Sequence, residues 1–379
     1  MVELQNIFLE HGQEYRQNHM LTYVQSKAMS AIEKCRSSAL GGHMEVCEDC
    51  GCYQISYNSC RNRHCPKCQT LMKERWIENQ KSNLLNTGYF HVVFTIPYTL
   101  NTVVYQNQKG VYSLLFKAVA ETLSELALDK KYLGAKIGFT SVLHTWGQNL
   151  MHHPHIHCIV PGGGLNSLGR WVNSRKKFFL PVKVLSRKFR GKFLFYLKQT
   201  KLEFHGSQEY LKDDTSFQSL LSSLYQKEWV VYCKKPFKNA SCVVEYLGRY
   251  THRVAISNNR ILSIDNDNVT FKWRDYKDSS KWKTMTVSAE EFIRRFLIHI
   301  LPDGFMKIRH YGLLGNRNKT TRLKLCKQLT NTPVLFKEKA STLQLLQKIT
   351  GRDFTKCPHC GSDKLSRFAC FGKSPPETA

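Results

Sequence analysis

The sequence predicts an α+β protein built from several segments. Stretches with helical spacing of apolar residues alternate along the chain with short runs of β-branched and aromatic residues. The chain has 379 residues, 42% of them hydrophobic, which is enough for two or three domains and a substantial buried core. Six of the 14 cysteines fall between residues 41 and 80, which indicates a separate cysteine-rich module.

Helices and strands are expected in a definite order. Residues 1–40 have helical spacing, and residues 41–85 form the cysteine module. A buried strand is predicted in 89–100, where a proline closes a β-rich run, and a helix over 110–128. The runs "AKIGFTSVLHTWGQNL" and "HIHCIVPGGGL" predict two neighbouring strands joined by a histidine-rich turn.

The second half of the chain continues this alternation. Helical patterns dominate residues 182–235 and end in the strand-like "EWVVYC", and "ASCVVEYLGRYTHR" (240–253) predicts a short helix. The runs "RILSI", "VTFKW" and "TMTVS" predict a β meander within a basic extension, residues 256–335. A last helix, about 338–349, leads into a cysteine tail in the segment 336–379.

The net charge points to a polyanion as partner. Lys and Arg number 56 against 29 Asp and Glu, which gives +27 at pH 7. Nucleic acid is favoured over an anionic membrane surface, because no basic amphipathic helix stands out. We see no signal peptide and no membrane-spanning apolar run, so a cytoplasmic, DNA-associated location is expected. In that reducing compartment the cysteines are expected to bind metal rather than form disulfides.

Two Cys-x-x-Cys pairs predict a zinc site. Cys47 and Cys50 are followed after fourteen residues by Cys65 and Cys68, and each pair can reach one tetrahedral ion from a tight turn. Further cysteines and histidines nearby could hold a second ion or could be incidental buried thiols; they are Cys35, His43, Cys60 and His64. Arg61, Arg63 and Lys67 make the module basic, which suits DNA contact.

The C-terminal tail contains half of another zinc site. "KCPHCGSDKLSRFAC" supplies Cys357, Cys360 and Cys370; the fourth ligand is not evident from the sequence, and His359 or a distant residue could serve.

The stretch "HPHIHC" suggests a divalent cation site. His155 and His157 alternate with Ile156, so on a strand both imidazoles point to the same face. A neighbouring strand should supply the third ligand, and both His144 and Gln148 are candidates.

A pair of tyrosines adds a possible nucleophile. Tyr246 and Tyr250 lie one helical turn apart in "VVEYLGRYTHR", so both phenols would emerge from one helix face. An aromatic stripe packed on the core is the alternative, but basic neighbours sit poorly against a dry core. A metal beside two tyrosines in a basic protein suggests phosphoryl transfer to a phenol.

Four stretches in colinear order resemble one known family. They are "GGHMEVCEDCGCYQISYNSCRNRHCPKCQ", "VLHTWGQNLMHHPHIHCIVPGGGL", "YLGRYTHRVAISNNRI" and "RHYGLLGNRNK". The order of "HVVFTIP", "HPHIH" and a Tyr-x-x-x-Tyr helix resembles HUH single-strand endonucleases of the two-tyrosine branch, and the whole resembles rolling-circle transposases of the IS91 insertion-sequence type. The likeness runs from about residue 10 to 365.

The resemblance implies a transposase that nicks one strand at the ends of a mobile element and forms a 5′-phosphotyrosine bond. It implies Tyr246 and Tyr250 as nucleophiles, His155 and His157 as ligands of Mg²⁺ or Mn²⁺, and structural Zn²⁺ at the N-terminal module. It also implies a catalytic domain over residues 86–255, built as an antiparallel sheet flanked by helices. Single-stranded or hairpin DNA at element ends and target DNA are the expected partners; the oligomeric state cannot be predicted.

Three basic side chains are candidates for binding DNA phosphates by their charge alone: Arg249, Arg253 and Arg309.

Alternative functions are a plasmid replication initiator or relaxase with the same chemistry, a non-enzymatic zinc-finger DNA-binding protein, and a metal-dependent hydrolase. The cysteine module and the absence of a G-x-x-x-x-G-K-[ST] sequence favour the transposase.

Overall fold

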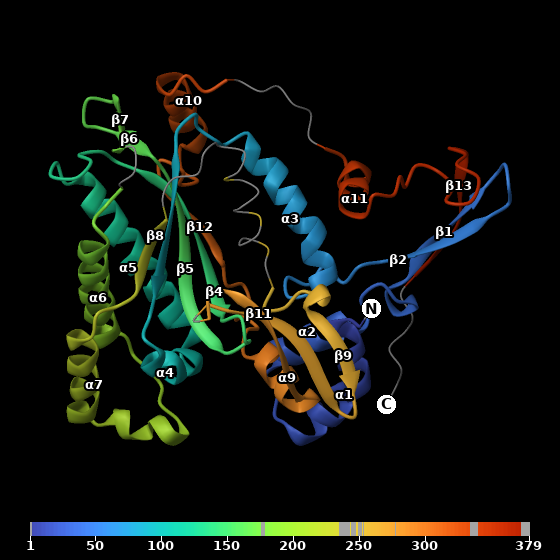
Figure 1. Cartoon of the computed structure of the whole chain (residues 1–379), viewed down its shortest axis with the longest axis horizontal. Helices are drawn as coiled ribbons and strands as arrows, with labels where there is room; N and C mark the ends of the chain where they lie inside the picture. Colours follow the sequence, from blue (N-terminus) through green and yellow to red (C-terminus); the bar gives the residue numbers. More distant parts are fainter. Residues whose placement is uncertain are drawn as a thin grey trace.

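The computed structural model describes residues 2–175, 179–234, 243, 248, 252, 254–276, 278–333 and 340–372 (Figure 1). At its centre lies a five-stranded antiparallel sheet with the strand order β12-β4-β5-β3-β8. The strands are β3 (Tyr89–Thr95), β4 (Gly138–Trp146), β5 (His152–Pro161), β8 (Val231–Lys234) and β12 (Ile308–Gly312). β-Branched and aromatic side chains fill β3, and Pro97 follows it where a proline cannot continue the ladder.

Helices cover one face of the central sheet (Figure 1). They are α4 (Asn101–Gln106), α5 (Gln108–Leu128), α6 (Val182–Gln199) and α7 (Asp214–Gln226). Successive side chains of a strand point to opposite faces, so Ile156, Cys158 and Val160 of β5 enter the core beneath these helices. Phe189 and Phe193 of α6 belong to the same buried cluster.

The opposite face of the sheet carries the two histidines of the His-x-His pair and lies beside α3 (Pro66–Lys81). Tyr89 of β3 and Ile159 of β5 form a small apolar cluster there with Val243, and Trp76 of α3 packs against it. Because Ile159 follows His157 by two residues, this cluster and the His-x-His pair share one sheet face.

A second hydrophobic core joins the N-terminal helices to a distant part of the chain. It contains α1 (Leu4–Asn18), α2 (Tyr23–Glu33), the meander β9 (Ile261–Asp265), β10 (Asn268–Asp275) and β11 (Lys281–Ser288), and α9 (Ala289–Leu297). The rings of Phe8 and Phe296 meet edge to face at 5.5 Å in this core. The amphipathic N-terminal helices therefore pack on the meander and α9.

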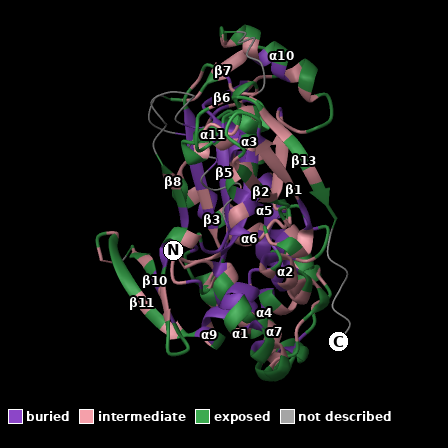
Figure 2. Cartoon of the chain, turned by 90° about the vertical axis from the view of Figure 1, so that its right-hand side faces the viewer, coloured by how far each residue is buried: buried purple, intermediate pink, exposed green. Residues whose placement is uncertain are grey.

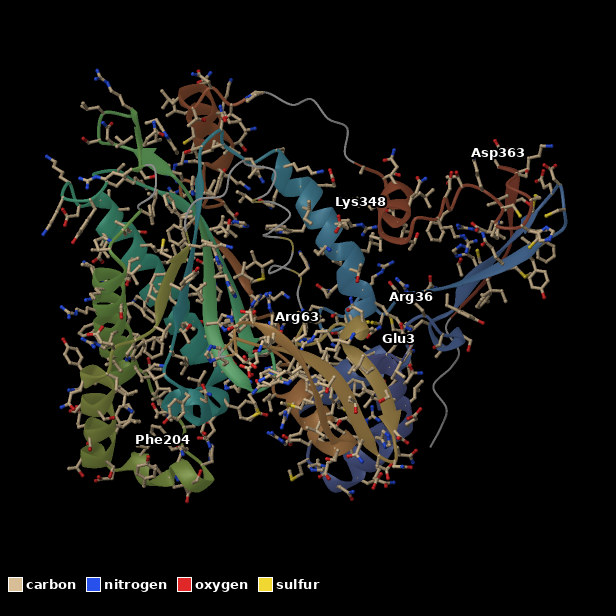
Figure 3. All side chains as sticks on the ribbon, in the orientation of Figure 1. Glu3, Arg36, Arg63, Phe204, Lys348 and Asp363 are labelled. Carbon is tan, nitrogen blue, oxygen red and sulfur yellow. The ribbon has the colours of Figure 1, made fainter. Side chains whose placement is uncertain are left out.

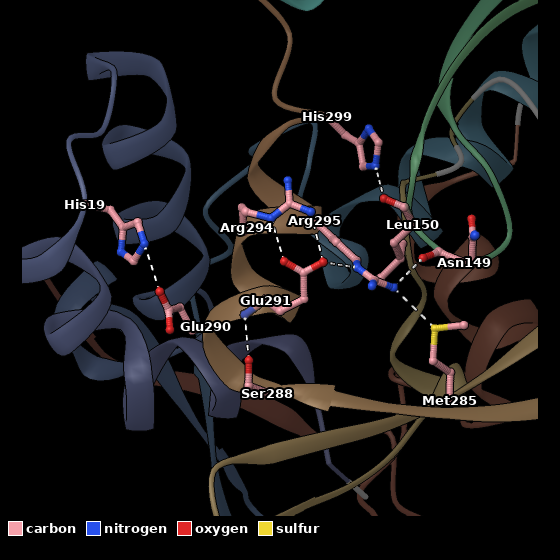
Figure 4. Close-up of polar contacts among 10 residues, drawn as sticks. All are labelled: His19, Asn149, Leu150, Met285, Ser288, Glu290, Glu291, Arg294, Arg295 and His299. Atoms are coloured by element: carbon pink, nitrogen blue, oxygen red, sulfur yellow. Dashed lines mark hydrogen bonds and ion pairs between the residues drawn. The ribbon is translucent and has the colours of Figure 1, made fainter. Parts of the chain in front are cut away.

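Helix α9 also holds the turn between β4 and β5 (Figure 4). Arg295 donates a hydrogen bond to the Asn149 carbonyl at 3.2 Å, and Glu291 accepts one from Arg295 Nε at 2.6 Å. The Leu150 carbonyl lies 2.9 Å from His299 Nε2. These contacts fix the chain just before the His-x-His strand.

A third, small sheet brings the two ends of the chain together. Its order is β13-β1-β2, with β1 (Gly42–Cys47), β2 (Tyr53–Tyr57) and β13 (Leu365–Phe371). Most of its residues are half-buried or exposed, whereas the central sheet is largely buried (Figure 2).

The segment before β13 contacts α3. Lys348 of α11 (Thr342–Thr350) forms an ion pair with Glu74 at 2.8 Å, and Arg75 donates to the Thr342 hydroxyl at 2.8 Å (Figure 3).

The remaining elements are η1 (Ser38–Leu40), η2 (Tyr98–Leu100), β6 (Gly163–Leu165), β7 (Trp171–Asn173), η3 (Gly206–Lys212), η4 (Asn258–Arg260) and α10 (Lys319–Leu329). None of the helices in the described part of the chain combines the length and apolarity needed to cross a membrane.

The predicted α+β class is confirmed, including the helical N-terminus, the antiparallel sheet core and the C-terminal cysteines. The β meander is also observed. Two details differ from expectation. β5 already begins at His152, so the histidine-rich stretch is strand rather than turn. β12 lies within 256–335 yet pairs with β4 of the central sheet. The helix expected at 240–253 lies outside the described residues except for Val243, Gly248 and His252.

Candidate functional site

Three histidines meet on the α3-facing side of the central sheet. His155 and His157 lie on one face of β5, as their alternation predicts, and the antiparallel register sets His144 of β4 opposite His155. One ring nitrogen from each of the three lies within 4.8 Å of the others. We call His144, His155 and His157 the histidine group.

Of the two candidates for the third position, the structure brings His144 to the pair. β4 ends at Trp146, so Gln148 lies in the following turn and does not share a strand face with His144. The Gln148 side-chain amide donates instead to the Tyr276 hydroxyl at 3.1 Å. Gln148 therefore lies outside the strand face of the histidine group, and its role as the third ligand stays a prediction.

The orientation of the His-x-His rings is set through their Nδ1 atoms. His155 Nδ1 donates to the His153 carbonyl at 2.6 Å, and His157 Nδ1 lies 2.8 Å from Nε2 of His91. Metal-binding imidazoles commonly use one nitrogen for the ion and the other for such a partner. Nε2 is thus the nitrogen through which His155 and His157 would bind a cation.

The histidine group lies partly inside the molecule. His144 and His157 are buried, His155 is half-buried, and the ring of His144 stacks on Trp146 at 4.6 Å. Burial lowers the pKa of the neighbouring His91 to about 4, so it stays neutral at physiological pH. Three imidazoles with one side toward solvent suit a divalent ion that keeps positions for other ligands.

His91 was not recognised as a site residue from the sequence. It lies in the "HVVFTIP" run, and the register of β3 with β5 places it opposite Ile159, on the face of the histidine group. Period-two alternation gives the face of a strand, but only the register between strands shows that His91 meets His157.

The expected nucleophiles Tyr246 and Tyr250, and the arginines Arg249 and Arg253, lie outside the described residues. Three residues near them are described. Val243 is fully buried against Tyr89 and Ile159. A methyl group on Gly248 would come within 2.3 Å of Ile77 on α3, and His252 Nδ1 lies 3.0 Å from Gln69 Oε1.

The cysteines form two groups, neither of which is the predicted one. We expected Cys47 and Cys50 to share an ion with Cys65 and Cys68. Instead one group consists of Cys35, Cys60, Cys65 and Cys68, and the other of Cys47, Cys50, Cys357 and Cys360, with all sulfur atoms of a group within 4.8 Å. We call each Cys-x-x-Cys pair a knuckle. The hairpin β1-β2 carries the first knuckle, Cys47 and Cys50, away from α3 and toward β13, so this knuckle meets the C-terminal one instead of Cys65 and Cys68.

Each cysteine group contains a thiol whose pKa is lowered, while the pKa of Cys60 and Cys65 in one group and of Cys50 and Cys360 in the other is raised. Hydrogen bonds with neighbouring thiols, Cys60 foremost, lower the pKa of Cys35 to about 7. Backbone N–H groups of Cys360 and His359 lower the pKa of Cys357 to about 6. Thiolates are the form in which cysteine binds zinc.

Three further candidates for zinc lie outside both groups. His43 on β1 is 3.6 Å from a carboxylate oxygen of Glu45. His64 is half-buried, with its Nε2 accepting from the Leu301 N–H at 3.4 Å. Cys370 is exposed on β13, where it pairs with His43. The structure thus brings Cys35 and Cys60 together, as expected for a second ion, and leaves His43 and His64 outside both cysteine groups.

The predicted DNA-contacting side chains differ in their surroundings. Arg63 donates to the carbonyls of Leu301 and Pro302 at 3.2 and 2.7 Å, and Lys67 pairs with Glu3 at 2.5 Å, so both have partners inside the protein (Figure 3). Arg61 is exposed. The Arg309 guanidinium lies 4.3 Å from the ring centre of Phe116. Only Arg61 of the three N-terminal candidates keeps the exposure that a phosphate contact needs.

Two family models match the chain. One, described as "Putative transposase", matches residues 138–322, which include the histidine group and both tyrosines. The other, described as "Transposase zinc-binding domain" of the IS91 type, matches residues 7–96, which include Cys35, Cys60, Cys65 and Cys68.

Two curated proteins are similar over most of their length. The "Putative transposase y4qJ" of Sinorhizobium fredii is 46% identical over 385 residues, covering 97% of this chain and 95% of the relative. The "Transposase for insertion sequence element IS801" of Pseudomonas savastanoi pv. phaseolicola is 28% identical over 300 residues, covering 78% and 71%. No solved structure matches the chain.

Proposed function

Because the chain belongs to the IS91 family of insertion-sequence transposases, we propose that it cuts single-stranded DNA at the ends of a mobile element by tyrosine attack and moves that element by rolling-circle transposition. The observation that carries this proposal is the histidine group on the α3-facing side of the central antiparallel sheet. A transposase binds DNA, and the net charge of +27 suits that partner.

The chemical step is an in-line transfer of a phosphate to a phenol. The phenol oxygen of Tyr246 or Tyr250 attacks the phosphorus, the Tyr O–P bond forms and the P–O3′ bond breaks. The proton leaves the phenol, and the departing 3′ oxygen ends as a free hydroxyl. The phosphotyrosine bond keeps the energy of the broken linkage, so the same strand can later be joined to target DNA.

The histidine group would hold the divalent ion that this chemistry needs. When bound, Mg²⁺ or Mn²⁺ polarises the scissile phosphate and stabilises its developing charge, and imidazole ligation favours Mn²⁺. The chain's own part is to hold the three rings in place: His91 and the His153 carbonyl orient His157 and His155 through Nδ1. Neutral imidazoles keep their lone pairs available for the ion.

The contacts of Val243, Gly248 and His252 support a role for the neighbouring tyrosines. Val243 packs on Ile159, which shares a sheet face with His157. Gly248, which lies between the two tyrosines in the sequence, approaches Ile77 of α3. Val243 thus lies on the sheet face of the histidine group and Gly248 lies against α3 beside it, which supports the proposal that Tyr246 and Tyr250 act at that group. Two tyrosines would allow a second transfer before the first end is released.

Adduct formation tests the proposal. Single-stranded oligonucleotides from the DNA that flanks the gene, labelled at the 3′ end, are incubated with the protein and Mn²⁺ and analysed on a denaturing gel. We expect label to travel with the wild-type protein, because the 5′ phosphate of the labelled fragment is on tyrosine. The double variant Tyr246→Phe/Tyr250→Phe should give no adduct, and the single variants should show which phenol acts first.

The matched control is Tyr225→Phe, an exposed tyrosine of α7 on the other side of the sheet. It should form the adduct at the wild-type rate. DNA that is cut without any adduct would show a metal-dependent hydrolase instead. DNA that is bound but not cut on any flank would favour a zinc-dependent DNA-binding protein without nuclease activity.

A further inference from the structure

The second cysteine group has the dimensions of a tetrahedral thiolate site. Cys47 and Cys360 place their sulfur atoms 3.6 Å apart, and Cys50 and Cys357 place theirs 3.7 Å apart. Four sulfurs around one ion with Zn–S bonds of about 2.3 Å lie about 3.8 Å from one another. All four are free thiols, so these short separations do not come from disulfide bonds.

The two halves of this group are built alike. Both have the sequence Cys-x-x-Cys-Gly, and the glycine has a left-handed backbone in each, with φ of 70° at Gly51 and 78° at Gly361. Gly51 N–H donates to the Cys47 carbonyl at 2.8 Å, and Gly361 N–H to the Cys357 carbonyl at 3.0 Å. Only glycine adopts this conformation without strain.

Further backbone bonds repeat between the halves. Cys47 N–H donates to the Cys52 carbonyl at 2.9 Å, and Cys357 N–H donates to the Ser362 carbonyl at 2.7 Å. The His359 N–H also points to the Cys357 sulfur at 3.4 Å. Two knuckles with the same turn, facing each other, are the arrangement expected of a ribbon-type zinc site.

The small sheet that carries these knuckles lacks a hydrophobic core. In β1 only Gly42 and Cys47 are buried, and no residue of β2 or β13 is. None of the described residues of these three strands belongs to a hydrophobic cluster. A sheet this small and open needs another source of stability, and a structural metal is the usual one.

We propose that Cys47, Cys50, Cys357 and Cys360 bind one Zn²⁺ as four thiolates, which joins the C-terminal segment to the N-terminal hairpin. This ion is distinct from the one at Cys35, Cys60, Cys65 and Cys68, and half of its ligands lie far beyond residues 7–96, the range of the matching zinc-binding domain. The zinc-binding part of the chain therefore consists of two separate stretches of sequence.

Polar contacts align the two knuckles. Asp49 accepts hydrogen bonds from the Ser362 hydroxyl at 2.6 Å and from Lys364 at 3.0 Å, and the pKa of its carboxyl is lowered by them. Glu48 N–H donates to the Lys364 carbonyl at 3.0 Å. These contacts align the knuckle of Cys47 and Cys50 with the knuckle of Cys357 and Cys360, and the bound ion would then hold the two knuckles together.

Metal content of the full-length protein tests the site. The variants are Cys47→Ser/Cys50→Ser, Cys357→Ser/Cys360→Ser and the combination of all four, measured by elemental analysis for zinc and iron. We expect each double variant to contain one zinc ion fewer per chain than wild type, and the fourfold variant also to lack only one. The controls Cys52→Ser and Cys370→Ser, which lie outside both groups, should keep the full content.

Three results would overturn the proposal. If Cys357→Ser/Cys360→Ser keeps all its zinc while Cys47→Ser/Cys50→Ser loses one ion, the first knuckle has other partners. If the fourfold variant loses two ions, the knuckles serve separate sites. Iron in place of zinc would reject the identity of the ion.

Thiol alkylation of the wild-type protein gives a readout that does not depend on the variants folding. Cys50, Cys360 and Cys370 are all exposed, so burial alone gives them similar access to reagent. Bound zinc should protect Cys50 and Cys360 while Cys370 is alkylated rapidly, and a chelator should remove the protection from both together. Equal alkylation of all three before chelation would contradict the site.

Discussion

Nε2 of His91 lies 2.8 Å from Nδ1 of His157, and the two rings stack with 7° between their planes. Both side chains are buried, on the adjacent strands β3 and β5. With Nδ1–H of His157 donating to His91, the tautomer of His157 presents its Nε2 lone pair to a cation. We therefore expect His91 to act as a positioning residue for the histidine group.

Replacing His91 by alanine should weaken metal binding. Loss of a partner that orients a metal-binding histidine typically lowers metal affinity or activity by about 10- to 100-fold. For His91→Ala we expect the Mn²⁺ concentration at half-maximal adduct formation to rise within that range, while DNA affinity without metal stays unchanged. His91→Gln, which can still accept a hydrogen bond, should recover part of the loss.

The control for this change is His205→Ala, an exposed histidine far from the sheet face that pairs with Glu203. It should leave the Mn²⁺ dependence as in wild type. An unchanged Mn²⁺ midpoint in His91→Ala would show that the His91 contact serves packing only.

Two single variants, His144→Gln and Gln148→Ala, should identify the third ligand of the divalent ion. His144→Gln keeps much of the side-chain volume but replaces an imidazole nitrogen by an amide, so we expect adduct formation to fall by at least about 100-fold, at the upper end of the loss quoted for metal-site changes. Gln148→Ala removes a turn residue and should retain most activity. Thermal melting of both proteins separates loss of the ligand from loss of the fold.

The opposite ranking, with Gln148→Ala inactive and His144→Gln active, would show that the turn between β4 and β5 rearranges to bring Gln148 to the ion.

Local patterns predicted most of the secondary structure and the His-x-His pair. A period of two along β5 is enough to place His155 and His157 on one face. The third member depends on how β4 is aligned with β5, since a shift by one residue turns His144 to the other face. The same holds for His91 on β3. Such registers are set by contacts between strands that a single sequence does not display.

The cysteines illustrate the same limit. Cys-x-x-Cys spacing identifies a knuckle from four residues, but it does not tell which two knuckles meet. Cys47 and Cys50 meet Cys357 and Cys360 because β13 pairs with β1, a contact between segments more than 300 residues apart. Cys65 and Cys68 at the start of α3 meet Cys35, just after α2, because α1 and α2 pack on the second core.

Loss of the N-terminal cysteine group should destabilise the second core. The Cys60 sulfur lies 3.6 Å from that of Cys68, and Cys35, Cys65 and Cys68 are buried with the residues of α1 and α2. For Cys60→Ser we expect one zinc ion fewer per chain and a loss of about 4 kcal/mol or more in the free energy of unfolding, the large effect typical of a lost metal. Elemental analysis and thermal denaturation measure both.

Cys52→Ser is the matched control, because Cys52 is half-buried in the same module but belongs to neither group. Its zinc content and melting temperature should equal those of wild type. A Cys60→Ser protein with full zinc content would mean that three thiolates and another ligand suffice.

The close approach of Gly248 to α3 predicts a compensating pair of mutations. An added methyl group at Gly248 would lie 2.3 Å from Cδ1 and 2.6 Å from Cγ1 of Ile77, so in Gly248→Ala either residue 248 or the Ile77 side chain must shift. We expect overpacking to cost about 1–3 kcal/mol of stability and adduct formation to fall by about tenfold or more. Ile77→Ala removes both clashing atoms, so the double variant should form adduct faster than Gly248→Ala alone.

Gly191→Ala in α6, where nothing lies within 4 Å of the added methyl group, should leave adduct formation unchanged. If Ile77→Ala brings no recovery, the loss in Gly248→Ala arises from the backbone of the segment itself rather than from its contact with α3.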